Sequence, residues 1–190
     1  MSRIVLDTNS LIQSIPPKSI YHAIWQSFLD GTNTLCVSTE ILAEYEEILQ
    51  RLTDIDTAQL VIELIVNNPH TLMFSPYYKF NLIASDPDDN KFVDCAIVAT
   101  AKYIVTEDHH YDVLKGCSFP KVDVVDLDTF LCEVQHLSKH SNEPSSSLLN
   151  EPAVVYGLEC DKPLLVFVIV IVIVQPLAVL ASTSLQVLYS

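Results

Sequence analysis

Short apolar runs alternate with stretches of helical periodicity over the first 137 residues of the chain. Runs of three or four apolar residues bounded by polar turns are typical of buried strands, and apolar positions three or four apart are typical of helices that cover a sheet. This order predicts an α/β fold with a parallel sheet of about five strands flanked by helices. The predicted strands are 4–6, 35–37, 72–74, 103–106 and 122–125, with some strand character at 77–83, and the predicted helices are 21–29, 38–52, 56–67, 85–101 and 127–137.

The pattern changes after residue 137. Residues 138–152 are polar and contain proline, which predicts a linker, and residues 153–190 form a hydrophobic tail. Within this tail, residues 164–181 are apolar except for Gln175-Pro176, and these 18 residues reach only the lower edge of the roughly 17–25 that a membrane-spanning helix needs. Three interpretations stay open: a membrane anchor, a buried strand or helix, and an aggregation-prone segment without an evolved role.

Composition narrows the classes of function. The net charge of −14 excludes attraction of nucleic acid by the overall field of the protein, so metal ions and a few local cations would have to provide it. With 3 glycines, the chain has neither a dinucleotide-binding motif nor a lysine-containing phosphate loop. The 5 cysteines form no CxxC pair and indicate a reduced compartment. The opening residues enter a strand without a signal-peptide pattern, so we expect a cytoplasmic protein.

Two aspartates follow predicted strands. Asp7 comes directly after the first strand, and Asp108 comes two residues after the fourth. Taken alone, Asp7 is more simply explained as a helix cap. If these two strands are neighbours, however, both side chains open onto one crevice at the carboxyl edge of the sheet, where ligands of such folds bind.

The predicted helix 38–52 carries several glutamates. Glu40 and Glu47 point away from its apolar stripe and are expected in solvent. Glu44 and Glu46 flank the two edges of the stripe about equally. Periodicity therefore leaves open which of these two reaches over the crevice.

The segment 86–90 is rich in carboxylates at the start of a predicted helix, where acids also serve as caps. Asp89 is distinctive because it shares a helix face with the small residues Val93 and Ala96, which predicts an inward direction. Asp94 lies about 140° further around the helix and is not expected at the same site. Carboxylates gathered in one crevice repel each other unless a cation such as Mg²⁺ or Mn²⁺ neutralises them.

Two competing sites are weaker. His109 and His110 suggest zinc, but adjacent histidines lack the usual ligand spacing, so a surface loop is the better interpretation. A phosphatase with an aspartyl nucleophile would need a second acid two residues after Asp7, where Asn9 stands. Lys91, just after Asp89, and Lys79 could contact RNA phosphates, but a solvated lysine is the better interpretation of each.

The chain resembles PIN-domain ribonucleases, most closely the toxin components of bacterial toxin–antitoxin pairs. The resemblance covers residues 1–137 and is carried in order by IVLDTNSLI, VSTEILAEYEEIL, DPDDNKFVDCAIVATAKYIVTED and HHYDVL. It implies a PIN-like parallel sheet and a metal site for catalysis formed by Asp7, Glu44, Asp89 and Asp108, which selects Glu44 over Glu46. It also implies that Asn9 and Thr106 support the acids.

The resemblance further implies an Mg²⁺- or Mn²⁺-dependent endoribonuclease that hydrolyses single-stranded RNA, and a partner antitoxin whose segment enters the acidic crevice. Dimers are common among such proteins, although the sequence offers no homodimer interface that we would defend. The alternative is a PIN-like module that binds RNA or a partner without cutting, with or without a membrane anchor at residues 164–181. Four facing carboxylates argue against it, because a site freed from metal binding has no physical reason to keep them.

Overall fold

The computed structural model describes residues 1–140, and its centre is a parallel sheet of five strands. The strand order is β3-β2-β1-β4-β5, and each neighbouring pair is parallel. The predicted α/β class, the number of strands and their parallel direction are therefore confirmed. The strands are β1 (Ser2–Leu6), β2 (Asn33–Ser38), β3 (Thr71–Phe74), β4 (Tyr103–Val105) and β5 (Asp123–Val125).

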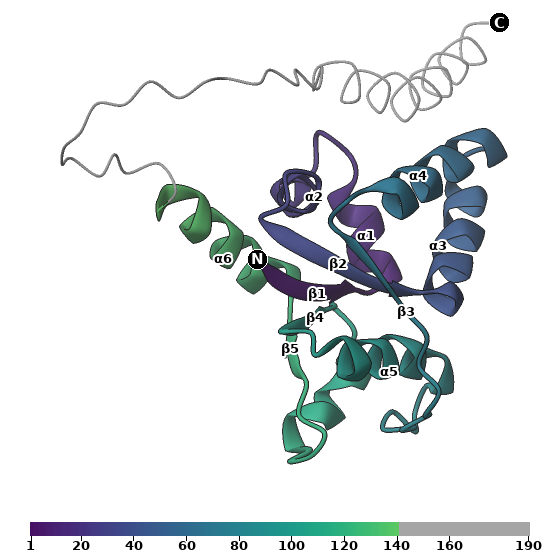
Figure 1. Ribbon diagram of the computed structural model, residues 1–190, viewed down its shortest axis with the longest axis vertical. Coiled ribbons are helices and arrows are strands. Elements are labelled where there is room, and N and C mark those ends of the chain that lie inside the picture. The colour runs from purple at the N-terminus through teal and green to yellow at the C-terminus, as the bar shows by residue number, and fades with distance from the viewer. Residues whose placement is uncertain (141–190) are drawn as a thin grey trace, which may run out of the picture. The chain divides into compact units, whose positions relative to one another are not determined.

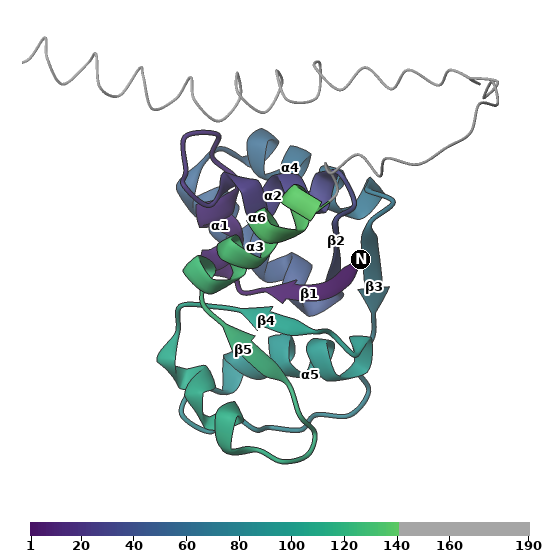
Figure 2. The same cartoon turned by 90° about the vertical axis from the view of Figure 1, so that its left-hand side faces the viewer.

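Helices cover both faces of this sheet. Figures 1 and 2 show α5 on one side and α1 to α4 with α6 on the other. The α-helices are α1 (Thr8–Ser14), α2 (His22–Leu29), α3 (Thr39–Leu52), α4 (Ile55–Asn67), α5 (Asn90–Ala99) and α6 (Leu127–His140), and two 3₁₀ helices are η1 (Pro87–Asp89) and η2 (His109–Gly116).

The core consists of the central strands and the apolar helix faces packed on them. Every residue of β2 is buried, and Ile4, Val5 and Leu6 of β1 are fully buried, as expected for strands covered on both faces. From α3, Ile41 and Tyr45 are fully buried against this layer. The centre of the apolar stripe predicted from periodicity is thus the face that packs, while Leu52 at the end of the helix is exposed.

The chain winds outward from β1 in both directions, and this topology places the site. After β1 it builds β2 and β3 on one side, and it later returns to add β4 and β5 on the other. Leu6 is paired with Val105 in the β1–β4 ladder, so both strands end at the same edge. The crevice of an open α/β sheet lies at such a switch point. Asp7 and Asp108 were expected at one edge only if the strands before them were neighbours, and β1 and β4 are neighbours.

Several helix boundaries follow from local capping chemistry. The Ser38 hydroxyl accepts a hydrogen bond from the Ile41 amide at 3.3 Å and begins α3 where the sequence predicted. Asp54 caps α4 by accepting from the Thr57 amide at 2.8 Å, so this helix begins slightly earlier than predicted. The helix expected over 85–101 begins as η1 and continues as α5.

Three local predictions are wrong. Residues 8–14 form α1, which the predicted helices do not include, and residues 109–116 form η2 rather than a loop. Residues 77–83 form no strand. The helix at the end of this unit extends to His140, beyond the predicted start of the linker at 138.

The remaining linker and the tail up to residue 190 lie outside the described residues, and so does the apolar run 164–181. Within residues 1–140, no helix combines the length and apolar character needed to span a bilayer.

Candidate active site

Asp7 lies at the carboxyl end of β1 and is almost completely buried. It occupies the N-cap position of α1, yet its side chain makes no cap hydrogen bond, so the simpler explanation of this residue does not hold. Burial raises the pKa of Asp7 from 3.8 to about 6; the Thr106 hydroxyl opposes this rise, and the nearby Asp89 and Glu44 carboxylates add to it. Three carboxylates from different elements therefore act on one another at this edge.

Thr106 connects the first acid to the fourth. Its hydroxyl donates a hydrogen bond to Asp7 Oδ2 at 3.2 Å and accepts one from the Asp108 amide at 3.0 Å. The Asp7 amide in turn donates to the Val105 carbonyl at 3.0 Å. The two strand ends are thus held together by both backbone and side-chain bonds.

Glu44, rather than Glu46, faces this cluster. One Glu44 carboxylate oxygen accepts a hydrogen bond from the Thr8 hydroxyl at 2.5 Å, and the other lies 2.5 Å from Lys91 Nζ. Glu46 instead accepts a hydrogen bond from Gln50 on the outside of α3. The choice that periodicity left open is decided by the packing of α3 against α1, which presents Thr8 to Glu44.

Asp89 ends η1 and leads into α5. Burial raises the pKa of this carboxyl, and the neighbouring Asp86 and Asp108 carboxylates raise it further. Its Oδ2 atom is buried and has no hydrogen-bond partner among the described residues. A buried carboxylate oxygen without a donor is costly unless something positively charged completes its surroundings.

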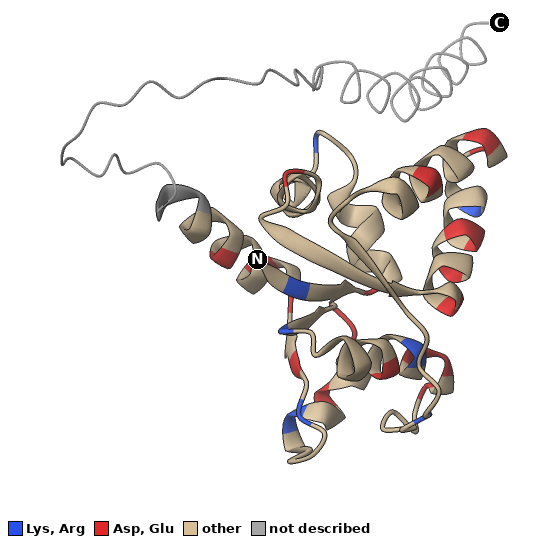
Figure 3. Ribbon diagram, viewed as in Figure 1, with Lys and Arg blue, Asp and Glu red and all other residues tan. Residues whose placement is uncertain are grey.

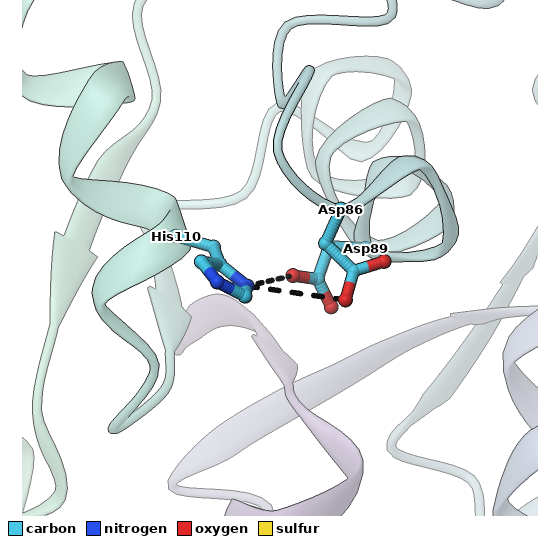
Figure 4. A group of neighbouring side chains, drawn as sticks. All are labelled: Asp86, Asp89 and His110. Carbon is cyan, nitrogen blue, oxygen red and sulfur yellow. Dashed lines mark ion pairs between the residues drawn. The ribbon is translucent and has the colours of Figure 1, made fainter.

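His110 is a neighbour of Asp89 that was not predicted as a site residue. His110 Nδ1 lies 3.4 Å from Asp108 Oδ1, 3.6 Å from Asp89 Oδ2 and 3.9 Å from Asp86 Oδ2. Figure 4 shows the His110 ring facing both Asp86 and Asp89. The sequence signal that could have indicated His110 is its position two residues after Asp108. In the structure the Asp108 side chain accepts a hydrogen bond from the His110 amide at 2.8 Å, and this bond turns the chain back towards the acids.

Tyr111 is a further residue that the sequence did not reveal. Its side chain is fully buried, and its hydroxyl has no hydrogen-bond partner of good geometry among residues 1–140. Burial raises the pKa of Tyr111 far above its usual value, and the Asp7, Asp89 and Glu44 carboxylates add to that effect. The hydroxyl therefore faces the acid cluster.

Other acidic and polar candidates lie elsewhere. Asp94 is fully buried on the far side of α5, where it accepts a hydrogen bond from the Phe80 amide at 3.0 Å, as its helical angle predicted. Asn9 is exposed in the first turn of α1, and within the described residues it makes no hydrogen bond to the four acids. Its supporting role stays a prediction.

The surrounding surface is poor in cations. Figure 3 shows acidic residues outnumbering lysine and arginine on the described ribbon, in keeping with the net charge of −14. Lys91 is already engaged with Glu44, and Lys79 with Glu40 at 2.7 Å. Neither is a free phosphate-binding lysine.

The parallel sheet gathers acids that follow β1 and β4 and that come from α3 and η1 at one edge, which is where ligands of open α/β sheets bind. Residues 3–110 match the family model of the PIN domain, and the chain belongs to this family. Membership supports a nuclease, and hence a hydrolase, as the class of enzyme.

Two solved structures are similar to the chain. One is VapBC2 from Rickettsia felis, bound to a DNA fragment from its promoter, with 18% identity, a TM-score of 0.48, and coverage of 65% of this chain and 98% of that one. The other is DNA-bound VapBC from Salmonella typhimurium, with 17% identity, a TM-score of 0.48, and coverage of 67% and 99%. No curated protein matches the chain.

Proposed function

We propose that this chain is a metal-dependent endoribonuclease that hydrolyses phosphodiester bonds of single-stranded RNA, and that it is the toxin of a toxin–antitoxin pair. The observation that carries the proposal is the gathering of the Asp7, Glu44 and Asp89 carboxylates at the carboxyl edge of the sheet, where burial first, and then the charges of Asp89 and Glu44, raise the pKa of Asp7. We assign the activity to residues 1–137.

The acid cluster fits a divalent cation. Asp89 has a buried oxygen without a hydrogen bond, and Asp7 is held among carboxylates that disfavour its charge. A cation among these oxygens would complete the surroundings of Asp89 and stabilise the charged form of Asp7. Mg²⁺ and Mn²⁺ are the ions that carboxylate oxygens suit. The residues that would hold it are Asp7, Glu44, Asp89 and Asp108.

The neighbouring residues keep these carboxylates in position for catalysis. Thr106 holds Asp7 through its hydroxyl, and Thr8 with Lys91 holds Glu44 from two sides. Fixed carboxylates require little rearrangement when substrate binds, which is the basis of electrostatic preorganisation. When bound, the cation supplies Lewis acidity towards water and towards the phosphoryl oxygens.

Single-stranded RNA is the substrate that we propose, because an unpaired backbone can bend to reach buried acids at the sheet edge more readily than a duplex can. The negative surface disfavours binding through the overall field, so the neutralised acid cluster has to provide the attraction. Attack by water rather than by the ribose 2′-hydroxyl leaves a 5′-phosphate and a 3′-hydroxyl.

The proposed partner is a cognate antitoxin whose segment enters the same crevice and blocks the acids. A cytoplasmic location agrees with an RNA substrate and with the free cysteines of the described region, Cys36, Cys95, Cys117 and Cys132.

The test is cleavage of an end-labelled single-stranded RNA by the full chain with Mg²⁺ or Mn²⁺, beside EDTA and the Asp7→Asn variant. We expect metal-dependent cutting that Asp7→Asn abolishes, with 5′-phosphate products. Asp112→Asn is a matched control, since this aspartate is exposed on η2 and paired with Lys115. A folded protein that neither binds metal by calorimetry nor cuts RNA would leave a non-catalytic binding module.

A further inference from the structure

His110 lies among carboxylates that come from two different segments of the chain. Its ring approaches Asp86 and Asp89 of the η1 segment, and also Asp108, which directly precedes η2. Its backbone amide is bonded to Asp108, so the direction of the ring is set by the turn that begins η2. The four acids of the proposed nuclease do not account for this histidine.

The donor atoms of Asp86, Asp89 and His110 form a compact group. One ligand atom from each lies within 4.8 Å of the other two (Figure 4). Asp86 Oδ1 accepts from the Asp88 amide at 3.1 Å, which leaves its Oδ2 facing His110 at 3.9 Å. His110 Nδ1 lies 3.6 Å from Asp89 Oδ2 and 3.9 Å from Asp86 Oδ2, within the separations of about 3 to 4 Å between ligands of one cation with bonds of about 2.1 Å.

Two buried atoms beside this group lack partners. Asp89 Oδ2, which faces His110, has no hydrogen bond within the described region. The hydroxyl of the fully buried Tyr111 also has no hydrogen bond of good geometry there, although it faces the Asp89 carboxylate and interacts with it weakly. Buried polar atoms without partners call for a missing ion or water, so this cluster carries a sign of a ligand that an exposed acidic patch lacks.

The chemistry of the donors points to the type of ion. Two carboxylates alone would suit Mg²⁺, but an imidazole nitrogen favours first-row transition metals, and Mg²⁺ prefers oxygen ligands. The geometry points to a metal position formed by Asp86, Asp89 and His110 in which the imidazole binds Mn²⁺ in preference to Mg²⁺. This inference deepens the proposed function and rests on it, because Asp89 is shared with the catalytic acids.

A protonated His110 that merely neutralises the acids is the competing explanation. The two differ in the effect of removing the ring. If His110 is a metal ligand, its removal weakens metal binding. If it is only a positive charge, its removal strengthens metal binding. Metal affinity of the His110→Asn variant therefore separates them by its sign.

The first measurement is calorimetry of Mn²⁺ and Mg²⁺ binding to the full chain without RNA. Removing an outer partner of a metal ligand already lowers affinity about 10- to 100-fold, so we expect His110→Asn to lower Mn²⁺ affinity at least as much. Mg²⁺ affinity should change far less. His109→Asn is the matched control, since its side chain is 95% exposed and faces Asp112 instead, and it should leave both affinities unchanged.

The second measurement is pulsed electron paramagnetic resonance of the Mn²⁺-loaded chain. We expect a nitrogen coupling in the wild type and in His109→Asn that is lost in His110→Asn and in His110→Asp, while the added carboxylate of the aspartate variant raises its Mg²⁺ affinity above that of His110→Asn. Absence of the coupling in the wild type, or tighter Mn²⁺ binding by His110→Asn, overturns the inference. Asp7-dependent RNA cleavage without nitrogen coupling would contradict the His110 metal position and leave the proposed nuclease standing. Nitrogen coupling without RNA cleavage would support the metal position and contradict the nuclease.

Discussion

The hydroxyl of Thr106 donates a hydrogen bond to Asp7 Oδ2 at 3.2 Å, between residues 99 positions apart in the chain. The same hydroxyl oxygen accepts from the Asp108 amide at 3.0 Å. One side chain thus fixes the carboxylate at the end of β1 and the backbone that leads to the acid after β4. Because the hydrogen bond to Asp7 is buried, this threonine affects the charge of Asp7 as well as its position.

Replacing Thr106 with valine should impair metal binding through Asp7. The variant keeps the side-chain shape but removes a hydrogen bond that holds down the pKa of Asp7, so more Asp7 is protonated near pH 7. We expect metal affinity to fall severalfold at pH 7 and to recover towards pH 9, with a loss of about 1 to 2 kcal/mol in stability. Calorimetry across this pH range checks it. Thr106→Ser should retain affinity, and an equal loss at every pH would contradict the explanation.

Asp7→Asn should stabilise the metal-free protein at neutral pH. The pKa of Asp7 is raised from 3.8 to about 6 on folding, so its ionisation opposes folding. This penalty is absent below pH 3.8, develops as the pH rises towards 6, and is fully present above it. A rise of about two pKa units corresponds to about 2 to 3 kcal/mol. Asparagine removes the charge and still accepts the Thr106 hydrogen bond.

Denaturant unfolding in EDTA measures this difference. We expect the variant to be more stable than the wild type at pH 7 by the stated amount, and by less than half of it at pH 4.5. With saturating Mn²⁺ the order should reverse, since only the wild type is stabilised by binding the ion. An advantage that stays constant between pH 4.5 and 7 would contradict a role for the Asp7 charge.

The sheet and its helices could be predicted because their signals are local. Apolar runs mark β1, β2 and β4, and Ser38 marks the start of α3 by capping chemistry. Helix α1 was missed because Asp7-Thr8-Asn9-Ser10 is typical of a turn, and α1 has only 7 residues in which to show periodicity. For the 3₁₀ helix η2, a search for a period of 3.6 residues is the wrong test.

The site was predictable in part, for a different reason. Asp7 and Asp108 follow strands, so topology alone brings them to one edge. The pairing of His110 with Asp86 depends on how η2 packs against η1, and no period along the chain encodes that contact. The same holds for Glu44, which is distinguished from Glu46 only by its contacts with Thr8 and Lys91.

Lys91→Met should increase the metal affinity of the protein and lower the stability of its metal-free form. The ammonium group lies 2.5 Å from Glu44 Oε2 and partly neutralises the cluster. Its removal abolishes repulsion with an incoming divalent cation, which we expect to raise affinity by roughly 3- to 10-fold. Without metal, Glu44 loses its counter-ion, and stability should fall by about 1 kcal/mol.

The matched control for Lys91 is Lys79→Met, because Lys79 pairs with Glu40 and approaches Asp94, away from the acid cluster. Its metal affinity should be that of the wild type in the same titration. If Lys91→Met bound metal more weakly than the wild type, the loss of Lys91 as a contact that positions Glu44 would outweigh the removal of its charge, and the electrostatic explanation would be wrong.

Tyr111→Phe and Tyr45→Phe should have opposite effects on the metal-free protein. Both tyrosines are fully buried, but the Tyr45 hydroxyl donates to the Leu6 carbonyl at 2.5 Å, whereas the Tyr111 hydroxyl has no partner of good geometry in the described region. Removing a bonded hydroxyl leaves the carbonyl unsatisfied and should destabilise by about 1 to 2 kcal/mol. Removing an unbonded one relieves a desolvation penalty, so Tyr111→Phe should be neutral or stabilising by about 1 kcal/mol.

Tyr111→Phe should also reduce the metal affinity severalfold, since in the metal-bound protein the hydroxyl beside Asp89 has a water or ligand to contact. Thermal unfolding of both variants with EDTA and with Mn²⁺ tests these signs, and destabilisation of the metal-free Tyr111→Phe protein would show that its hydroxyl already has a partner.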